Sequence, residues 1–289
     1  MIKDREYLRA FRCFGGFMLF VMVLVNVFGN LEIPLQLIFY NISENIIQHT
    51  SQLGAMLGFA YTYYLGYRIF IKRFELPLFS FKKIPLRKIL PAIIEMLLAL
   101  IVIRVTWHIQ IQLLAKIGYF VQNEATTEPL FMLVYSIIGA PIMEELVFRG
   151  WLLNLLKKYG IIPAVLFSSL AFGLFHGTLV QAFPAFIIGL IFSYLALQYR
   201  SIIPGIIVHM MTNAISTLPI LPNEEQLMPY FMIASAVILL IWLIINARDL
   251  FSRRKELPMC FQLGWKSISW TVFCIISVGL IILGYVMGI

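Results

Sequence analysis

One apolar stretch, PIMEELVFRG at residues 141–150, carries two adjacent carboxylates and a guanidinium. On a helix, Glu145 and Arg149 are spaced i,i+4 with the glutamate N-terminal, so we expect them to form an ion pair. Glu144 points about 100° away from Glu145 around the same helix. Snorkelling to the membrane surface would explain the arginine but not two glutamates. Because ionisable residues at membrane depth are costly, Glu144 is a candidate functional group.

Two further apolar stretches each carry an imidazole. His176 ends LAFGLFH and shares a helix face with Phe172, four residues earlier. His209 and Asn213 lie four residues apart in HMMTN, so an imidazole and a carboxamide project from one face. Taken singly, each is also compatible with an interior polar residue that holds membrane helices together.

Together the three stretches supply the groups that a hydrolase requires. A carboxylate can activate water as a general base, and imidazole and amide N–H groups can stabilise the oxyanion of a tetrahedral intermediate. Two carboxylates in different surroundings, one beside an arginine and one not, suit different roles. We expect Glu144 to find its partner in His176, on another helix.

Several other catalytic patterns are missing from the chain. It contains no H-E-x-x-H zinc-protease helix, no G-x-S-x-G nucleophile elbow and no P-loop. The only aspartates, Asp4 and Asp249, lie at the edges of predicted spans, which excludes an intramembrane aspartyl dyad.

The elements that carry the candidate residues are apolar helices. Of the 289 residues, 61% are apolar and 12% are charged, whereas soluble domains have roughly a quarter charged residues. Long apolar runs along the whole chain indicate an all-α, polytopic transmembrane helical bundle. We expect eight or nine spans, and the candidates are residues 11–29, 52–71, 89–115, 129–153, 161–178, 180–198, 202–220, 229–247 and 267–288.

The charges between the spans predict the orientation. Lysine and arginine gather at the N-terminus and in alternate connections, near residues 72–88, 157–158, 200 and 248–255. The remaining connections, at 30–51, 117–128 and 221–228, contain neither. By the positive-inside rule, the N-terminus is cytoplasmic. The net charge of +8 therefore reflects orientation in a cell membrane rather than nucleic-acid binding, and the short loops favour a bacterial plasma membrane.

The predicted boundaries place two candidate residues at different depths. At about 1.5 Å per residue, Glu144 lies about 22 Å from the outer end of its span and so nearer the cytoplasm. His176 lies about 22 Å from the inner end of the next span and so nearer the outside. A water shared by both requires one depth. We therefore expect a shifted boundary or a broken helix, with Pro141 as a candidate kink and part of 116–128 as additional helix.

The three stretches resemble the motifs of the CAAX-processing and bacteriocin-processing (CPBP, or Abi) family of intramembrane proteases. The motifs E-E-x-x-x-R, F-x-x-x-H and H-x-x-x-N match EELVFR, FGLFH and HMMTN. They occur in order, with 32 residues between the first glutamate and the first histidine and 33 between the two histidines. The resemblance covers about residues 125–220. We expect N-terminal helices of unrecognised type at 1–120, a catalytic core at 121–222 and C-terminal helices at 223–289.

The resemblance implies a role for each motif residue. Glu144 and His176 would activate the attacking water, and His209 and Asn213 would stabilise the oxyanion. The supporting residues would be Glu145, Arg149 and Phe172. We favour a mechanism without a cofactor, because a zinc site formed by Glu144, His176 and His209, which is the alternative, would use an oxyanion donor as a ligand.

The leading function is therefore an intramembrane endopeptidase, related to CAAX prenyl endopeptidases, that cleaves a peptide or lipidated peptide within the bilayer. The alternatives are a non-catalytic membrane scaffold or bacteriocin self-immunity protein of the same family, and a proton-coupled transporter, which would also place glutamate and histidine at depth. A second polar set is better explained by pairing between helices than by catalysis; it consists of Glu95, Arg104 and His108.

Overall fold

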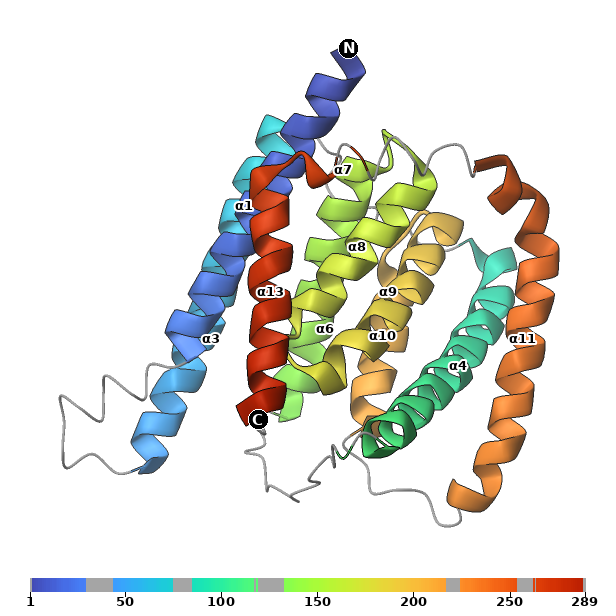
Figure 1. Cartoon of the computed structure of the whole chain (residues 1–289). Coiled ribbons are helices and arrows are strands. Elements are labelled where there is room, and N and C mark those ends of the chain that lie inside the picture. Colours follow the sequence, from blue (N-terminus) through green and yellow to red (C-terminus); the bar gives the residue numbers. More distant parts are fainter. Residues whose placement is uncertain are drawn as a thin grey trace. The chain divides into compact units, whose positions relative to one another are not determined.

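The structure, a computed structural model, describes residues 2–29, 44–74, 85–116, 118, 133–216, 224–253, 262 and 264–287. Every regular element in these residues is a helix, which confirms the predicted all-α class (Figure 1). Each predicted span overlaps a helical segment. Three of the described helices, Arg5–Leu24, Leu86–Lys116 and Val180–Tyr199, are long and apolar enough to cross a membrane. The helix expected within 116–128 falls almost entirely outside the described residues.

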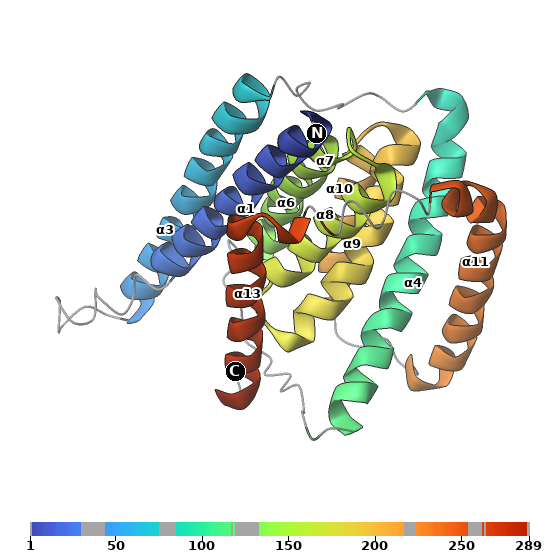
Figure 2. The same ribbon diagram turned by 45° about the horizontal axis from the view of Figure 1, so that its top comes forward.

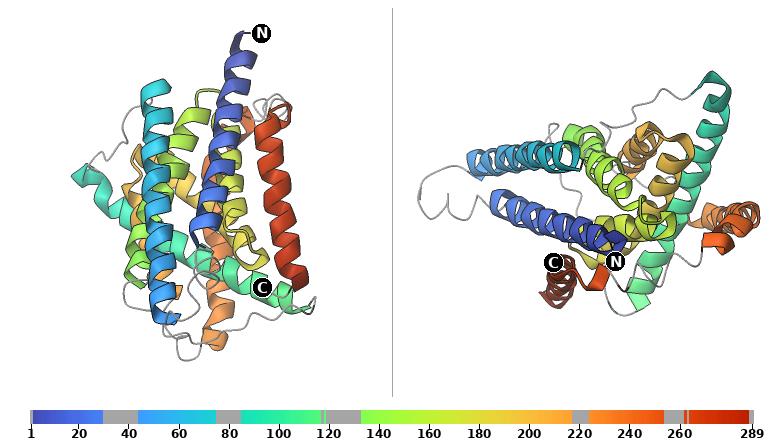
Figure 3. Two further views of the ribbon diagram at one scale, coloured as in Figure 1. Left: turned by 90° about the vertical axis from the view of Figure 1, so that its left-hand side faces the viewer. Right: turned by 90° about the horizontal axis from the view of Figure 1, so that it is seen from above.

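One compact unit comprises Met1–Pro77 and Leu263–Ile276. Its elements are α1 (Ile2–Gly29), α3 (Glu44–Gly66), the π-helix η1 (Tyr67–Arg73) and the first part of α13 (Ile268–Met287). Helices α1 and α3 run side by side (Figure 3). Trp270 of α13 packs against Phe11 and Phe14 of α1, with ring centroids 5.9 and 5.2 Å apart. Gly15 permits this approach, because a Cβ there would lie 2.3 Å from the Trp270 amide nitrogen.

The second unit, Leu78–Gln262 with Ser277–Ile289, contains all three motif stretches. Its main elements are η2 (Leu86–Lys88), α4 (Ile89–Lys116), η3 (Tyr135–Gly139), α6 (Ala140–Glu145), η4 (Leu146–Leu153), α7 (Asn154–Leu156), α8 (Ile161–Phe175), α9 (Leu179–Tyr199), α10 (Ile203–Ser216) and α11 (Glu224–Arg253). Helix α8 lies along α9, and α4 packs against α9, α10 and α11 (Figure 2). Between α4, α9 and α10 lies an apolar core formed by Ala92, Met96, Ala99, Ile103, Phe192, Leu195 and Val208.

The helix that carries the glutamates is not a regular α-helix. The π-helical segments η3 and η4 lie on either side of α6. Side chains bind two backbone carbonyl groups of η4: Asn154 Nδ2 donates to Gly150 O at 2.6 Å, and Ser168 Oγ of α8 donates to Phe148 O at 2.9 Å. Such π segments within helices are frequent at functional sites.

Two glycines set the ends of α8 and thereby the place of His176. Gly160 precedes the helix with a φ of 151°, and Gly177 follows it with a φ of 70°, conformations that residues with a side chain rarely adopt. Thr178 then begins α9, accepting a hydrogen bond from the Gln181 amide at its hydroxyl. His176 therefore stands at the C-terminal end of α8, directly before the turn.

The observed helix ends reduce the expected difference in depth between the two catalytic candidates. The glutamate-bearing helix extends to Leu156 rather than 153, and α8 begins at Ile161. Counted from this hairpin, Glu144 lies 12 residues before Leu156, and His176 lies 15 residues after Ile161. The boundary that differs from the prediction is thus the C-terminal end of the glutamate-bearing helix, next to the hairpin that leads into α8.

Two of the basic connections gather at one end of the second unit. Burial lowers the pKa of Lys157, in the α7–α8 hairpin, and the positive charges of Arg200 and Lys158 lower it further. Arg200 ends α9, so the hairpin and the α9–α10 connection lie close together. This is the arrangement that the positive-inside pattern predicts for two loops on one side of a membrane.

Candidate active site

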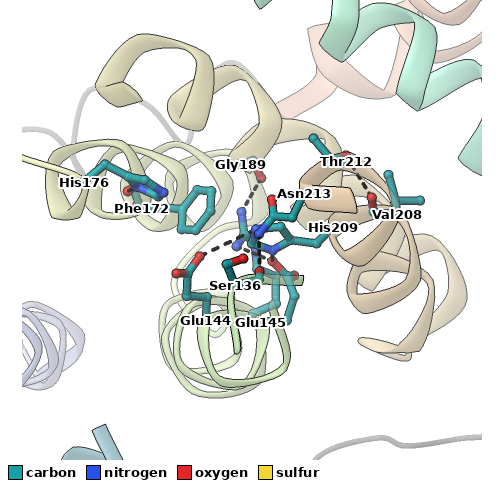
Figure 4. A network of polar contacts seen from close by, with 11 residues as sticks. Ser136, Glu144, Glu145, Phe172, His176, Gly189, Val208, His209, Thr212 and Asn213 are labelled. Carbon is teal, nitrogen blue, oxygen red and sulfur yellow. Dashed lines mark hydrogen bonds and ion pairs between the residues drawn. The ribbon is translucent and has the colours of Figure 1, made fainter. Parts of the chain in front are cut away.

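Residues of η3, α6, η4, α8, α9 and α10 form a polar cluster (Figure 4), which contains the predicted ion pair between Glu145 and Arg149. Arg149 Nη1 donates to Glu145 Oε1 at 2.7 Å, and both side chains are fully buried. Buried charges are tolerated when they are paired and hydrogen-bonded. The spacing of four residues on one helix was therefore sufficient to predict this contact.

Arg149 also connects η4 to α8 and α9. Its Nη2 donates to Gly189 O at 3.2 Å. The guanidinium carbon lies 4.4 Å from the Phe172 ring centroid and 5.2 Å from that of Phe192, within cation–π range. Gly189 allows the close approach, because a Cβ there would lie 3.2 Å from Nη2. Arg149 thus connects three helical segments, η4, α8 and α9, through its side-chain contacts.

One carboxylate oxygen of Glu145 contacts two side chains, those of Arg149 and His209. Its Oε1 lies 2.7 Å from Arg149 Nη1 and 3.3 Å from His209 Nδ1. Its Oε2 lies close to Gly205 of α10, where a Cβ would come within 2.9 Å of that oxygen. Glu145 is therefore fixed on both sides, and it orients His209 by accepting from Nδ1.

Replacing Gly205 by alanine is expected to destabilise the protein. The new Cβ would press on Glu145 Oε2, which cannot move without loosening its contacts to Arg149 and His209. Overpacking of this kind costs about 1–3 kcal/mol, which thermal unfolding of the purified protein would measure. The matched control is Gly279→Ala, where no atom lies within 4 Å of the added carbon. Equal stability of the two variants would contradict this role of Gly205.

Glu144 is paired with a histidine other than the one expected. Its Oε2 lies 3.6 Å from His209 Nε2, and 15% of its side chain is exposed. His209 thus lies between the two glutamates, with one ring nitrogen facing each. Across the residues that the structure describes, no hydrogen bond or ion pair joins Glu144 to His176, the partner that the sequence predicted, and the role of His176 stays a prediction. Among the described residues, Glu144 Oε2 is buried and has no hydrogen-bond partner within the protein.

Phe172 separates the two histidines. Its ring meets that of His176 edge-on at 4.8 Å and that of His209 edge-on at 5.7 Å. His176 Nδ1 lies 2.8 Å from Phe172 O, so the Nδ1–H donates to this carbonyl and leaves Nε2 available. His176 therefore flanks the cluster from the far side of Phe172, as Figure 4 shows.

Asn213 binds a backbone carbonyl group that has no donor within its own helix, because the residue that would supply the donor is a proline. Its Nδ2 donates to Ser136 O at 2.8 Å. In η3 the Ala140 amide bonds to Tyr135 O, and the next residue, Pro141, has no N–H to offer Ser136. Pro141, which was expected to kink the helix, thus leaves Ser136 O available to accept a hydrogen bond from Asn213 of α10. Sequence reasoning missed Ser136 as a partner, although the proline five residues on was a usable signal.

The residues suggested for zinc do not converge. Within the described part of the chain, no three His, Cys, Asp or Glu side chains lie close enough together to hold a metal ion. Glu144 and His209 are neighbours, but His176 lies beyond the Phe172 ring.

Glu95 lies outside this cluster, on α4. Its carboxylate accepts a hydrogen bond from the Tyr199 hydroxyl of α9. This contact agrees with the expectation that Glu95 serves pairing between helices.

Comparison with known protein families finds one that matches the part of the chain containing this site. A family model described as type II CAAX prenyl endopeptidase Rce1-like matches residues 126–215, a range that includes all three motifs. No curated protein and no solved structure matches the chain significantly. Residues 126–215 are therefore similar to the Rce1-like type II CAAX prenyl endopeptidase domain, which is consistent with a protease of the CPBP family.

Proposed function

We propose that the chain is an intramembrane endopeptidase in which Glu144 activates water. The observation that carries this proposal is the state of Glu144 Oε2, a buried carboxylate oxygen without a hydrogen-bond partner in the described residues, 3.6 Å from an imidazole. A carboxylate with a free lone pair in apolar surroundings is suited to accept a proton. The similarity of residues 126–215 to the Rce1-like domain supports a peptidase activity.

The proposed reaction begins with attack by water on the scissile carbonyl carbon. Glu144 takes a proton from the water as the new C–O bond forms, and His176 Nε2 is the second partner of that water. Collapse of the tetrahedral intermediate breaks the C–N bond. The proton held by Glu144 then passes to the leaving amine, so that atoms and charges balance.

The oxyanion would be stabilised from α10. Asn213 Nδ2 carries two N–H groups, of which one is donated to Ser136 O and the second remains for the substrate. His209 donates from Nδ1 to Glu145, so it can donate from Nε2 as well only as the doubly protonated imidazolium.

The substrate would be a peptide or lipidated peptide that enters from the bilayer. We place the protein in a cell membrane, as in bacteria, with eight or nine spans and a cytoplasmic N-terminus. The basic connections that meet at Lys157 and Arg200 support this orientation.

Purified protein in proteoliposomes is expected to cleave membrane-associated peptides, which mass spectrometry of the products would detect. Matched peptides with and without a C-terminal prenyl group test the lipid requirement. Absence of cleavage, with full cellular function retained by Glu144→Gln, would favour the scaffold or immunity alternative.

Chelators are expected to leave the activity unchanged, because the proposed water is activated by side chains alone. The comparison uses the same proteoliposomes before and after dialysis against a strong zinc chelator. The positive control is a known zinc protease treated in parallel. Loss of cleavage that added zinc restores would contradict the metal-free mechanism.

A further inference from the structure

A proline removes one backbone hydrogen bond from α9. Pro184 is the sixth residue of this helix, beyond the first turn, in which the backbone N–H groups have no partner within the helix anyway. In an α-helix the amide of residue 184 would donate to the carbonyl of residue 180, but a proline has no N–H. The Val180 carbonyl is therefore left without its usual donor in α9, whereas the Thr178 carbonyl keeps its bond to the Ala182 amide at 2.8 Å.

A carboxamide from another helix takes the place of the missing donor. Gln110 of α4 donates from Nε2 to Val180 O at 2.9 Å, across 70 positions of the chain. The Gln110 side chain is buried. Within a bilayer, a carbonyl that a proline leaves without a donor must be satisfied by a neighbour, because lipid tails offer no donor. Gln110 therefore supplies to α9 the hydrogen bond that Pro184 removes.

The active-site cluster contains the same arrangement a second time. There Pro141 leaves Ser136 O without a donor, and Asn213 of α10 donates to that carbonyl from Nδ2 at 2.8 Å. Both bonds join a carboxamide on one helix to a carbonyl before a proline on another. Asn213 belongs to the H-x-x-x-N motif, whereas Gln110 lies outside the three motifs and outside the residues that match the family model. The structure thus identifies a counterpart of Asn213 that the motifs do not contain.

The bond from Gln110 holds the turn that follows His176. Val180 lies four residues after His176, in the first turn of α9. Between them, Gly177 makes the turn out of α8 with a φ of 70°. Helix α4 also packs against α10, the helix that carries His209. Through Gln110, α4 therefore fixes the start of α9, and with it the His176 end of α8, relative to α10.

We propose that Gln110 is a positioning residue for His176. It acts through the Val180 carbonyl and does not touch the water or the substrate. The inference rests on the proposed function, in which His176 Nε2 is a partner of the attacking water. Without the bond from Gln110, the first turn of α9 is free to shift, and the His176 ring leaves the position that the reaction requires. The carboxamide itself is needed, because an apolar side chain of similar size fills the space but cannot donate.

A double-mutant cycle in proteoliposomes tests the inference. Gln110→Leu is expected to lower kcat roughly tenfold to hundredfold, the range for a catalytic group displaced by up to about 1 Å, with KM changed less than about twofold. Pro184→Ala supplies an N–H that can donate to Val180 O within α9. In the Pro184→Ala background, Gln110→Leu should therefore change kcat less than about twofold. An equal loss of kcat in both backgrounds would overturn the inference.

The matched control is Gln112→Leu, the same change at an exposed position of α4. It is expected to keep wild-type kcat and KM, and a loss as large as that of Gln110→Leu would reject the specific role of Gln110. If Gln110→Leu does not give folded protein, adding Pro184→Ala should restore folding. A double variant that still fails to fold, beside a folded Pro184→Ala variant, would contradict the proposed bond.

A measurement independent of activity separates this inference from the proposed function. The chain contains four histidines, so NMR of isotope-labelled histidine gives few side-chain signals, and that of His176 is identified by its loss in His176→Ala. This signal is expected to shift on Gln110→Leu, but not when Pro184→Ala is already present. A signal that ignores Gln110→Leu overturns the inference even if the protein cleaves peptides. A protein without cleavage but with the expected shifts would reject the protease and keep the placement of His176 by Gln110.

Discussion

Glu144→Gln is expected to abolish peptide cleavage while the protein stays folded. The amide keeps the size of the side chain but cannot accept a proton from water, and general-base catalysis contributes about 10²–10⁴ in rate. Because 15% of the Glu144 side chain is exposed and its Oε2 makes no hydrogen bond within the described residues, little stability depends on its charge. The measurement is kcat in proteoliposomes, with thermal unfolding to verify the fold.

The matched control is Glu95→Gln, the same chemical change at another intramembrane glutamate. Glu95 accepts from Tyr199 and lies outside the cluster, so kcat should stay near the wild-type value. His176→Ala should also lower kcat, because His176 Nε2 is the proposed second partner of the water. Cleavage at the wild-type rate by Glu144→Gln would reject Glu144 as the base and leave the reaction to other residues.

Arg149→Leu is expected to be the most destabilising single substitution in the second unit. It leaves the fully buried Glu145 carboxylate without its closest cation and removes the donor to Gly189 O. Breaking a buried ion pair by removing one partner costs about 3–5 kcal/mol. The measurement is unfolding of the purified protein in detergent, followed by the loss of helical circular dichroism.

Two companion variants distinguish charge from packing at Arg149. Arg149→Lys keeps the charge but lacks the planar guanidinium that stacks on Phe172 and reaches Gly189, so intermediate stability is expected. Glu145→Leu combined with Arg149→Leu removes both charges and should recover much of the lost stability, as apolar replacements of buried pairs do elsewhere. If Arg149→Leu alone is as stable as the wild type, the ion pair is not what holds these helices together.

Several properties could be predicted from the sequence because they depend on near neighbours in the chain. Apolar runs long enough for helices predicted the all-α class, and the observed helical segments follow those runs. The contact between Glu145 and Arg149 follows from a spacing of four residues on one helix. The same rule accounts for His176 Nδ1 meeting Phe172 O, one turn earlier.

Other properties could not be predicted because they depend on how helices pack. Which imidazole faces Glu144 is set by the depth at which α8 and α10 lie beside α6, and the π segments change that depth and the direction of each side chain. Spacing along the chain contains neither quantity, so the contact between Glu144 and His209 was not predicted. The contact between Asn213 and Ser136 joins residues 77 positions apart and depends on the same packing.

The sequence by itself determined the helical class, the order of the three motifs and the contacts within single helices, because a helix places residues i and i+4 together whatever surrounds it. Only the tertiary structure decided that His209 lies between two glutamates, that Phe172 separates the histidines and that Gly205 and Gly189 admit the buried ion pair. These features arise from close packing between helices, where a single added carbon changes which side chains can meet.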